Sequence, residues 1–416
     1  MQDNDNNAAP VRGPHHPRGA IMRTILASLC VTLACLAPFA GAGAAEPVRI
    51  GMITTLSGGG SSLGIDVRDG FMLAVEQGDG RLGGVPVEVD AEDDARKVGR
   101  AVQIAQRMIQ RDGTRIVTGI IWSNLALAAV PRVLEAGAFY ISPNAGPSQF
   151  AGADCNRNYF NVAWQNDNLH EAVGQYVTDQ GHDTAYLLAP NYPAGKDALA
   201  GFKRYYEGEV VGEVYTKLGQ LDYAAELAAL REAAPDAVYF FLPGGMGINF
   251  IKQYGQAGLK DRIPLYGPAF SFDEGILSAT GDAALGVINA SQWSNDLDNA
   301  ANRAFVDAFQ ARYDRRPSLY ASQGYDAARL IGSALAAVDG DLDRADAFRE
   351  ALERAEFESV RGDFRFNSNH HPIQDIYVRE VYRTADGTLS NRIVARAFED
   401  HRDAYAGQCD MTSGDD

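Results

Sequence analysis

From Val48 onward, short apolar runs alternate with stretches in which apolar residues recur every three or four positions. The short runs predict strands, and the periodic stretches predict helices. In the first part of the chain we expect strands at 48–55, 85–91, 115–121 and 138–142, and helices at 65–77, 97–111 and 124–136. This alternation is typical of a parallel α/β sheet with helices on its faces.

A second series of the same kind begins after residue 160. Its expected strands are 184–189, 210–216, 236–242 and 263–267, and its expected helices are 168–180, 195–206, 223–233 and 247–257. The 371 residues that follow the predicted signal peptide exceed the ~250–300 residues that one hydrophobic core usually serves. The chain is therefore expected to form two lobes, each a parallel-type sheet flanked by helices.

The remainder of the chain has a different pattern. Helices are expected at 299–313, 321–338 and 344–354 without strands between them, and two strands, 373–383 and 391–398, follow. Helices that add no strands must cover an existing sheet, so we assign them to the first lobe. The predicted organisation is 46–160 with 292–358 as lobe 1, 161–291 with 359–400 as lobe 2, and 401–416 as a C-terminal tail. Crossings near 159–166, 288–295 and 357–364 would form a hinge that lets two lobes close on a ligand.

The N-terminal region has the pattern of an export signal. Met22 and Arg23 precede a short apolar segment, Ile25 to Phe39, and small residues follow it. This order predicts that residues 1–45 are an N-terminal extension and signal peptide, the signal covering about 22–45, with cleavage near Ala44 or Ala45. The apolar segment is shorter than the ~20 residues that a membrane-spanning helix needs.

Charge and cysteines narrow the possible partners. The net charge of −17 disfavours binding to nucleic acid and to anionic membranes. Cys30 and Cys35 lie in the predicted signal, so Cys155 and Cys409 are the cysteines of the exported chain. Two remaining cysteines in an exported protein usually pair, and this disulfide would attach the C-terminal tail.

The segment from Gly119 to Gly146 contains the clearest candidate site. An apolar strand, GIIWSN, leads into a helix that stops at Gly137, and a second strand, AFYISPN, follows. In such a βαβ unit the helix N-terminus, at Ser123 and Asn124, lies beside the open end of the second strand, where unpaired N–H groups can hold a small anion. Alternatively, Ser123 or Asn124 simply caps the helix.

Motifs for catalysis or cofactor binding are weak. Gly60 to Gly64 has the spacing of a nucleophile elbow around Ser62, which makes a hydrolase an alternative, but three glycines separate this serine from the first strand. Gly245 and Gly247 follow a strand as in a dinucleotide site, yet Phe250 replaces the third glycine. We therefore expect no catalytic residues, no cofactor and no metal.

Three segments together resemble a known family: VRIGMITTLSG near the start, GIIWSN…EAGAFYISPNAG, and DFRFNSNHHPIQDIYVREV near the end. They are similar to the leucine/isoleucine/valine-binding family of periplasmic binding proteins, the ligand-capturing components of ABC importers. The resemblance covers 48–400. It implies a type I fold of two α/β lobes with three hinge crossings, a monomer in the periplasm that closes on a small ligand without covalent chemistry, and an inner-membrane ABC permease as partner.

The family's binding motif aligns with Gly119 to Gly146 without a gap. The serine that receives the ligand carboxylate falls on Ser123, and the small-residue loop that offers backbone donors falls on Asn144, Ala145 and Gly146. Gly146 replaces a threonine, so a hydroxyl donor is lost while the N–H remains. The resemblance also places ligand contacts at Tyr192, at Tyr320 and near Met246.

One departure changes the expected ligand. In members that bind amino acids, a glutamate after Gly-Pro pairs with the ligand ammonium, and here that position is Ala269. Burying an ammonium without a carboxylate costs several kcal/mol, so an α-amino acid fits poorly unless another acid, such as Asp273, substitutes.

Aromatic residues surround the retained carboxylate end. Trp122 precedes Ser123, Trp164 stands with Gln165 at the first crossing, and Tyr192, Phe270 and Tyr320 are near the other motifs. The segments SPNAGPSQFAG and AWQND also resemble the corresponding segments of family members that take up aromatic acids. The sequence thus predicts a small carboxylate ligand, a benzoate- or cinnamate-like acid. A branched-chain amino acid or amide, and a sensor that hands its ligand-bound state to a receptor, remain alternatives.

Overall fold

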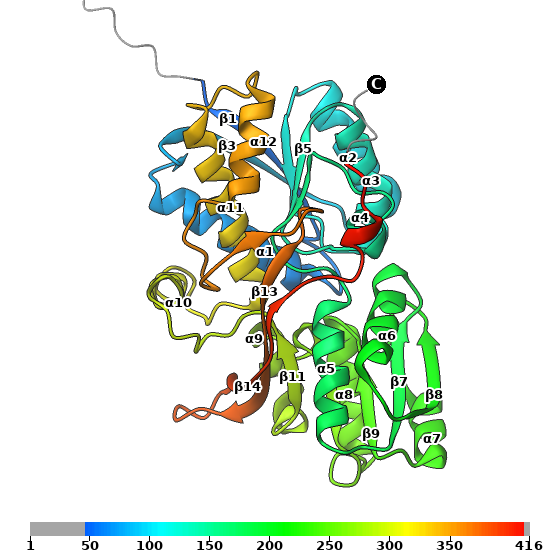
Figure 1. The fold of residues 1–416 in the computed structure, drawn as a ribbon. Helices are drawn as coiled ribbons and strands as arrows, with labels where there is room; N and C mark the ends of the chain where they lie inside the picture. Colours follow the sequence, from blue (N-terminus) through cyan, green and yellow to red (C-terminus); the bar gives the residue numbers. More distant parts are fainter. Residues whose placement is uncertain (1–45, 412–416) are drawn as a thin grey trace, which may run out of the picture. The chain divides into compact units, whose positions relative to one another are not determined.

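The computed structural model describes residues 46–411 (Figure 1). The predicted signal peptide and its cleavage site lie outside the described residues. The first lobe is built on a six-stranded sheet in the order β2-β3-β1-β4-β5-β6, parallel except for the β2–β3 pair. Its strands are β1 (Val48–Thr54), β2 (Arg81–Leu82), β3 (Val85–Asp93), β4 (Ile116–Thr118), β5 (Phe139–Ser142) and β6 (Tyr159–Asn161).

Helices cover both faces of this sheet, as the predicted alternation requires. On one face, Ile50 and Phe139 of the sheet are buried beneath α1 (Ser61–Gln77), α11 (Leu319–Ala337), which contributes Ile331, and α12 (Ala345–Arg354). The other face packs against α2 (Val98–Gln110) and α3 (Ser123–Glu135). The late helices α11 and α12 therefore return to the first lobe, while α10 (Ala300–Tyr313) lies beside α1, where the Tyr313 hydroxyl donates to Asp69 O at 3.0 Å.

The approach of α1 to α11 depends on two glycines. A Cβ at Gly70 would lie 1.9 Å from Ala321 O, and a Cβ at Gly324 would lie 2.0 Å from Val67 O. Only residues without a side chain permit backbones this close. The contact fixes the N-terminal turn of α11, which carries Tyr320 toward the space between the lobes.

The second lobe contains a sheet in the order β12-β13-β11-β10-β9-β7-β8, with β14 paired to β13. The strands from β7 to β11 are parallel, and β12, β13 and β14 join antiparallel. The strands are β7 (Thr184–Pro190), β8 (Glu209–Thr216), β9 (Ala237–Phe240), β10 (Leu265–Pro268), β11 (Ile288–Ser291), β12 (Arg365–Phe366), β13 (Pro372–Arg383) and β14 (Leu389–His401). Its helices are α5 (Asn168–Asp179), α6 (Pro193–Tyr205), α7 (Ala224–Ala233), α8 (Gly245–Gln256) and α9 (Glu274–Thr280).

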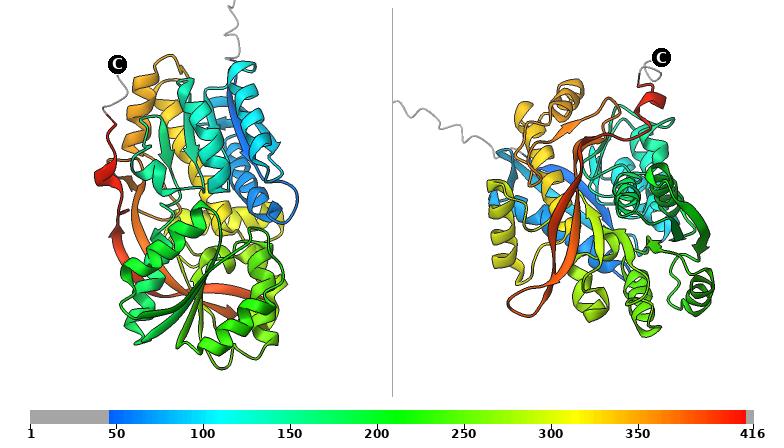
Figure 2. Two further views of the ribbon diagram at one scale, coloured as in Figure 1. Left: turned by 90° about the vertical axis from the view of Figure 1, so that its right-hand side faces the viewer. Right: turned by 60° about the horizontal axis from the view of Figure 1, so that its bottom comes forward.

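The segment 357–364, where the third passage between the lobes is predicted, contacts the core of the first lobe through Phe357 and Phe364. Phe364 and Phe366 pack with the first lobe, where the Phe366 ring lies 5.5 Å from that of Phe160. The long strand β13 then makes the passage, and Figure 2 shows β13 and β14 running along both lobes. Phe364 and Phe366 thus pack against the core of the first lobe, although β12, which contains Phe366, pairs with β13 of the second sheet.

The C-terminal segment returns to the first lobe after β14. Cys409 follows the short helix η3 (Ala406–Gln408) and forms a disulfide with Cys155, with the two Cα atoms 5.6 Å apart. Before reaching it, the tail contacts the second lobe, where the Tyr405 hydroxyl donates to Asp167 Oδ2 at 2.8 Å. The tail therefore touches both lobes.

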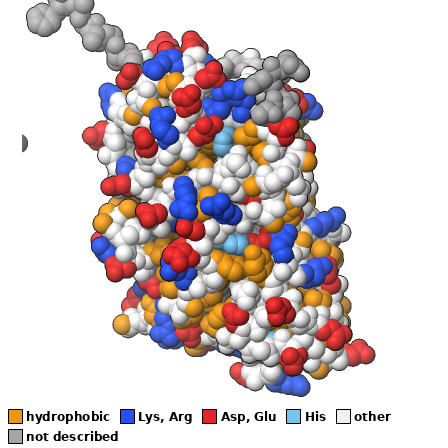
Figure 3. All heavy atoms as spheres, viewed as in Figure 1, with side chains coloured by type: hydrophobic (Ala, Val, Ile, Leu, Met, Phe, Trp, Pro, Cys, Tyr) orange, Lys and Arg blue, Asp and Glu red, His pale blue; other side chains and the backbone are white. Residues whose placement is uncertain are grey.

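The surface carries charges of both signs. Figure 3 shows acidic and basic side chains interspersed over the face in view, without a continuous basic patch there. Among residues 46–411, no helix is both long and apolar enough to cross a membrane.

Candidate ligand-binding site

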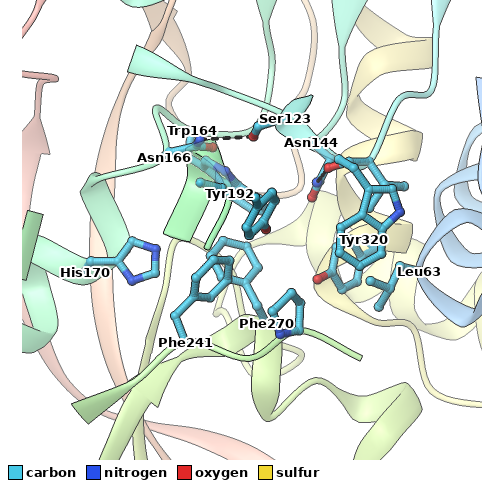
Figure 4. Close-up of a pocket in the computed structure, with 14 residues that line it drawn as sticks. Leu63, Ser123, Asn144, Trp164, Asn166, His170, Tyr192, Phe241, Phe270 and Tyr320 are labelled. Carbon is cyan, nitrogen blue, oxygen red and sulfur yellow. Dashed lines mark hydrogen bonds between the residues drawn. The ribbon is translucent and has the colours of Figure 1, made fainter. Parts of the chain in front are cut away.

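A cavity lies between the two lobes (Figure 4). Residues of both lobes and of the first crossing line it: Leu63, Ile121, Trp122, Ser123, Asn144, Trp164, Asn166, His170, Tyr192, Ala194, Phe241, Pro243, Phe270 and Tyr320. No Asp, Glu, Lys or Arg is among these lining residues, so within the described chain only neutral groups face a ligand here.

Ser123 is the first residue of α3, and its side chain does not cap the helix. Trp122 occupies the cap position, and no side chain accepts a hydrogen bond there. The Ser123 Oγ instead accepts from Asn166 Nδ2 at 3.1 Å. Because the oxygen is occupied as an acceptor, its own proton is available to a ligand oxygen, beside the N–H groups that a first helical turn leaves unpaired.

Asn144 lies next to Ser123 at the cavity wall. Its Nδ2 donates to Ile121 O at 2.7 Å, which ties the end of β5 to the loop before α3. Its Oδ1 is buried and has no partner among the described residues. The sequence-predicted pair Ser123 and Asn144 therefore meets at one end of the cavity.

Gly146 is not a free donor, in contrast to the sequence expectation. Its N–H donates to Asn166 Oδ1 at 3.2 Å, and Asn166 N donates back to Gly146 O at 2.8 Å. A Cβ at Gly146 would lie 2.1 Å from Trp164 O. The glycine is thus required because the first crossing passes against it, and a threonine could not be accommodated.

Four other predicted residues are buried without lining the cavity. Ala145 O accepts hydrogen bonds from Ser142 and Tyr159, and Gln165 pairs with Asp167. The Met246 sulfur accepts from Gly219 N, and Ala269 opens a short 3-10 turn that places Phe270 in the cavity. None of these four residues is among those that line the cavity.

Aromatic rings form most of the wall. Trp122 and Tyr192 approach from opposite lobes with ring centroids 6.3 Å apart. Trp164 meets Phe270 edge to face at 4.5 Å, and Tyr192 lies 6.2 Å from Phe241 in a stacked orientation. Such side chains offer flat apolar surface that suits another ring. The indole N–H of Trp122 donates to Thr55 Oγ1 at 3.0 Å, which fixes this ring against the first lobe.

Asp273 does not supply the acid missing at Ala269. Its carboxylate caps α9 by accepting from Gly275 N at 3.0 Å, and it also accepts from Leu319 N at 2.9 Å. Burial, and then the charge of Asp66, raise the pKa of Asp273 to about 8. Asp273 is therefore committed to joining α9 to α11 and lies outside the cavity lining.

His170 lines the cavity and was not predicted from the sequence. It is 1 % exposed, and its Nδ1 hydrogen-bonds to the hydroxyl of Tyr239. Burial lowers the pKa of His170 to about 3, so the imidazole is neutral at ordinary pH. Asn166, Phe241 and Pro243 were missed as well, although the last two directly follow β9, at the carboxyl edge where ligands of parallel sheets bind.

The chain belongs to the periplasmic binding protein family, whose model matches residues 47–388. It has the two-lobed type I fold of that family and is the solute-binding protein of an ABC transporter, a non-enzymatic class. The Ser62 hydrolase is therefore excluded, and Ser62 lies in the first turn of α1 rather than on an elbow.

Relatives and solved structures agree on this class. The Leu/Ile/Val-binding protein homolog 6 of Brucella melitensis is 27% identical over 387 residues, which span 90% of this chain and 98% of that protein. A solute-binding protein of an ABC transporter from R. palustris, solved in complex with benzoate, is 32% identical, with a TM-score of 0.82 over 87% of this chain and 99% of that one. A second, from Rhodopseudomonas palustris BisB5 in complex with 3,4-dihydroxybenzoic acid, is 30% identical, with a TM-score of 0.79 over 86% and 99%.

Proposed function

We propose that this protein captures a small aromatic acid, benzoate- or cinnamate-like, by closing its two lobes, and delivers it in the periplasm to an inner-membrane ABC permease. The observation that carries the proposal is the composition of the cavity. Six aromatic side chains line it, and no charged residue is among its described lining residues. We further propose that the protein acts as a monomer.

The carboxylate is held by neutral donors in this proposal. The Ser123 hydroxyl donates to one oxygen, and the unpaired N–H groups at the start of α3 complement its charge. The rings of Trp122, Trp164, Tyr192 and Tyr320 enclose the ligand ring, with Phe241 and Phe270 below (Figure 4). The benzoate and dihydroxybenzoate complexes of the two R. palustris proteins support this ligand class.

A branched-chain amino acid or amide is the second candidate, favoured by the name of the Brucella relative. An amino acid would bury its ammonium in a cavity that offers no carboxylate, because Ala269 stands at the glutamate position and Asp273 is committed elsewhere. An unpaired buried charge costs several kcal/mol. The cavity therefore favours the aromatic acid.

The two candidates are separated by a ligand panel. Thermal shift and tryptophan fluorescence are measured with benzoate, cinnamate, leucine, isoleucine and leucinamide. Trp122 and Trp164 line the cavity, whereas Trp293 is buried outside it and bonded to Asn302, so an acid that enters the cavity is expected to change the emission. Stabilisation by aromatic acids alone supports the proposal. Tight binding of leucine with no response to aromatic acids refutes it.

A further inference from the structure

His170 places a polar ring among the aromatic side chains that line the cavity. It projects from α5 of the second lobe, and its ring lies 5.0 Å from that of Phe241 and 5.9 Å from that of Phe270. Nδ1 is engaged by Tyr239, whereas Nε2 has no hydrogen-bond partner among the described residues. Figure 4 shows the imidazole facing the space beside Tyr192 and Phe241.

The Tyr239 contact determines which nitrogen carries the proton. The Tyr239 hydroxyl is fully buried, and His170 Nδ1 is its hydrogen-bond partner in the described chain. A buried phenol that does not donate its proton loses free energy, so Tyr239 donates and Nδ1 accepts. In a neutral imidazole the proton then resides on Nε2. His170 therefore presents a fixed N–H donor to the cavity.

We infer that His170 selects aromatic acids that carry an oxygen on the ring, by donating from Nε2 to a hydroxyl or ether oxygen. The inference rests on the proposed function, since it assumes an aromatic acid in this cavity. His170 and Ser123 belong to opposite lobes, and the aromatic side chains lie between them. With the carboxylate at Ser123, the ring directs a substituent toward the second lobe. A ring without an oxygen leaves the Nε2–H buried and unpaired, which penalises the unsubstituted acid.

The experiment compares dissociation constants from calorimetry for four probes: benzoate, 4-methylbenzoate, 3-hydroxybenzoate and 4-hydroxybenzoate. The methyl compound has nearly the size of the hydroxyl compound but accepts no hydrogen bond. The full-length exported protein and two variants are measured. His170→Leu removes the donor at similar volume, and His170→Gln retains an N–H near the Nε2 position. The readout is the ratio of dissociation constants, benzoate or 4-methylbenzoate over the tighter hydroxybenzoate.

The wild-type ratio is expected to reach about tenfold, the equivalent of one hydrogen bond to a buried donor. It is expected to fall to near one in His170→Leu and to recover in part in His170→Gln. A wild-type ratio near one overturns the inference, as does a ratio that survives in His170→Leu. A loss of affinity for all four acids alike in His170→Leu also overturns it, because His170 would then hold the carboxylate.

The same measurements distinguish a failure of the inference about His170 from a failure of the proposed function. Binding of benzoate without preference refutes only the role of His170. If none of the four acids binds and leucine does, the proposed function fails and the inference fails with it. The wild-type ratio needs no variant, so a variant that does not fold leaves the test intact.

Discussion

Ser123 has a different role in the structure from the helix cap that its position in the sequence allows. At the start of a predicted helix a serine is normally a cap, which satisfies a backbone N–H with its oxygen. Here Trp122 takes the cap position, and the Ser123 oxygen accepts from Asn166. The Asn166 Oδ1 also accepts from Gly146 N. The side-chain amide of Asn166 therefore bonds to both Ser123 and Gly146, the two parts of the expected carboxylate site. The hydroxyl proton of Ser123 is left for the ligand.

Replacing Ser123 with alanine is expected to weaken binding of an aromatic acid by about 1–3 kcal/mol, the cost of one hydrogen bond to a charged group. Calorimetry with benzoate measures the loss. Ser322→Ala is the matched control, because Ser322 is equally buried but donates within α11 to Leu319 O and does not line the cavity. Equal affinities of Ser123→Ala and wild type would leave Ser123 without a role in binding.

The sequence could predict part of this site but not all of it. Trp122, Ser123 and Asn144 were accessible because a βαβ unit places a helix start beside a strand end. Phe241 was accessible in principle by the same rule, since it follows β9. His170 was not, because it lies inside a helix and faces the cavity only through the packing of α5. The use of the Gly146 N–H by Asn166 likewise depends on how the crossing folds back.

At the scale of elements, the alternation of strands and helices was sufficient to predict two sheets and the return of α11 and α12 to the first lobe. Buried parallel strands are nearly continuous apolar runs, so they are easily recognised. The bounds of the third passage between the lobes stay a prediction. Near it lies β12, which is only two residues long and has no period of its own. Its place is set by the contact of Phe366 with Phe160, which joins residues distant in sequence.

Helices α4 (Ser148–Ala151) and α6 join the lobes directly through Asp197. This carboxylate accepts from Ser148 Oγ at 2.8 Å, from Ser148 N at 3.2 Å and from Asn166 Nδ2 at 2.9 Å. Ser148 belongs to the first lobe and Asp197 to the second. Since Asn166 also bonds to Ser123, the interlobe contact and the candidate carboxylate site share one residue.

Asp197→Asn is therefore expected to weaken ligand binding by about 1–3 kcal/mol by disfavouring the closed form. The amide can keep these contacts by placing its oxygen at Ser148 N and Asn166 Nδ2 and its N–H at the Ser148 hydroxyl, so the expected loss comes from the missing negative charge. Calorimetry with benzoate gives the affinity, and small-angle scattering of the ligand-free variant is expected to show a larger radius of gyration. Ser148→Ala, which removes one neutral donor, should have a smaller effect. An affinity equal to that of wild type would exclude this coupling.

For the whole molecule, buried acids set the dependence of stability on pH. Burial raises the pKa of Asp273 to about 8 and that of Asp167 to about 7. Between pH 6.5 and 8.5 the folded protein retains protons on these carboxyls that the unfolded chain has released. The free energy of unfolding therefore falls as pH rises through this range. Below it, His170, with its lowered pKa, acts in the opposite sense.

The expected decrease from pH 6.5 to 8.5 is about 2–3 kcal/mol, measured by urea unfolding at three pH values. Asp273→Asn should show a shallower decrease, because it lacks the carboxyl with the highest of these pKa values. Stability that rises over this range, or an unchanged slope in Asp273→Asn, would contradict the assignment.

The C-terminal tail, which follows the last strand β14, contacts both lobes. Tyr405 bonds to Asp167, and Arg204 of α6 lies over the Tyr405 ring at 5.6 Å. Asp403 accepts from Asn369 Nδ2 at 3.0 Å, and Cys409 is bonded to Cys155 of the first lobe. The disulfide closes a loop of 254 residues, which includes the entire second lobe.

Removing this disulfide is expected to lower the free energy of unfolding by about 2–5 kcal/mol, because a cross-link over a long loop restricts the unfolded chain. Cys409→Ser and Cys155→Ser should lose the same amount, and the double variant should lose no more, since both remove a single bond. Urea unfolding measures all three. A reducing agent should reduce the stability of wild type to that of the variants and leave the variants unchanged. Unequal losses, or sensitivity of the double variant to the reductant, would show that these two cysteines do not act as a pair.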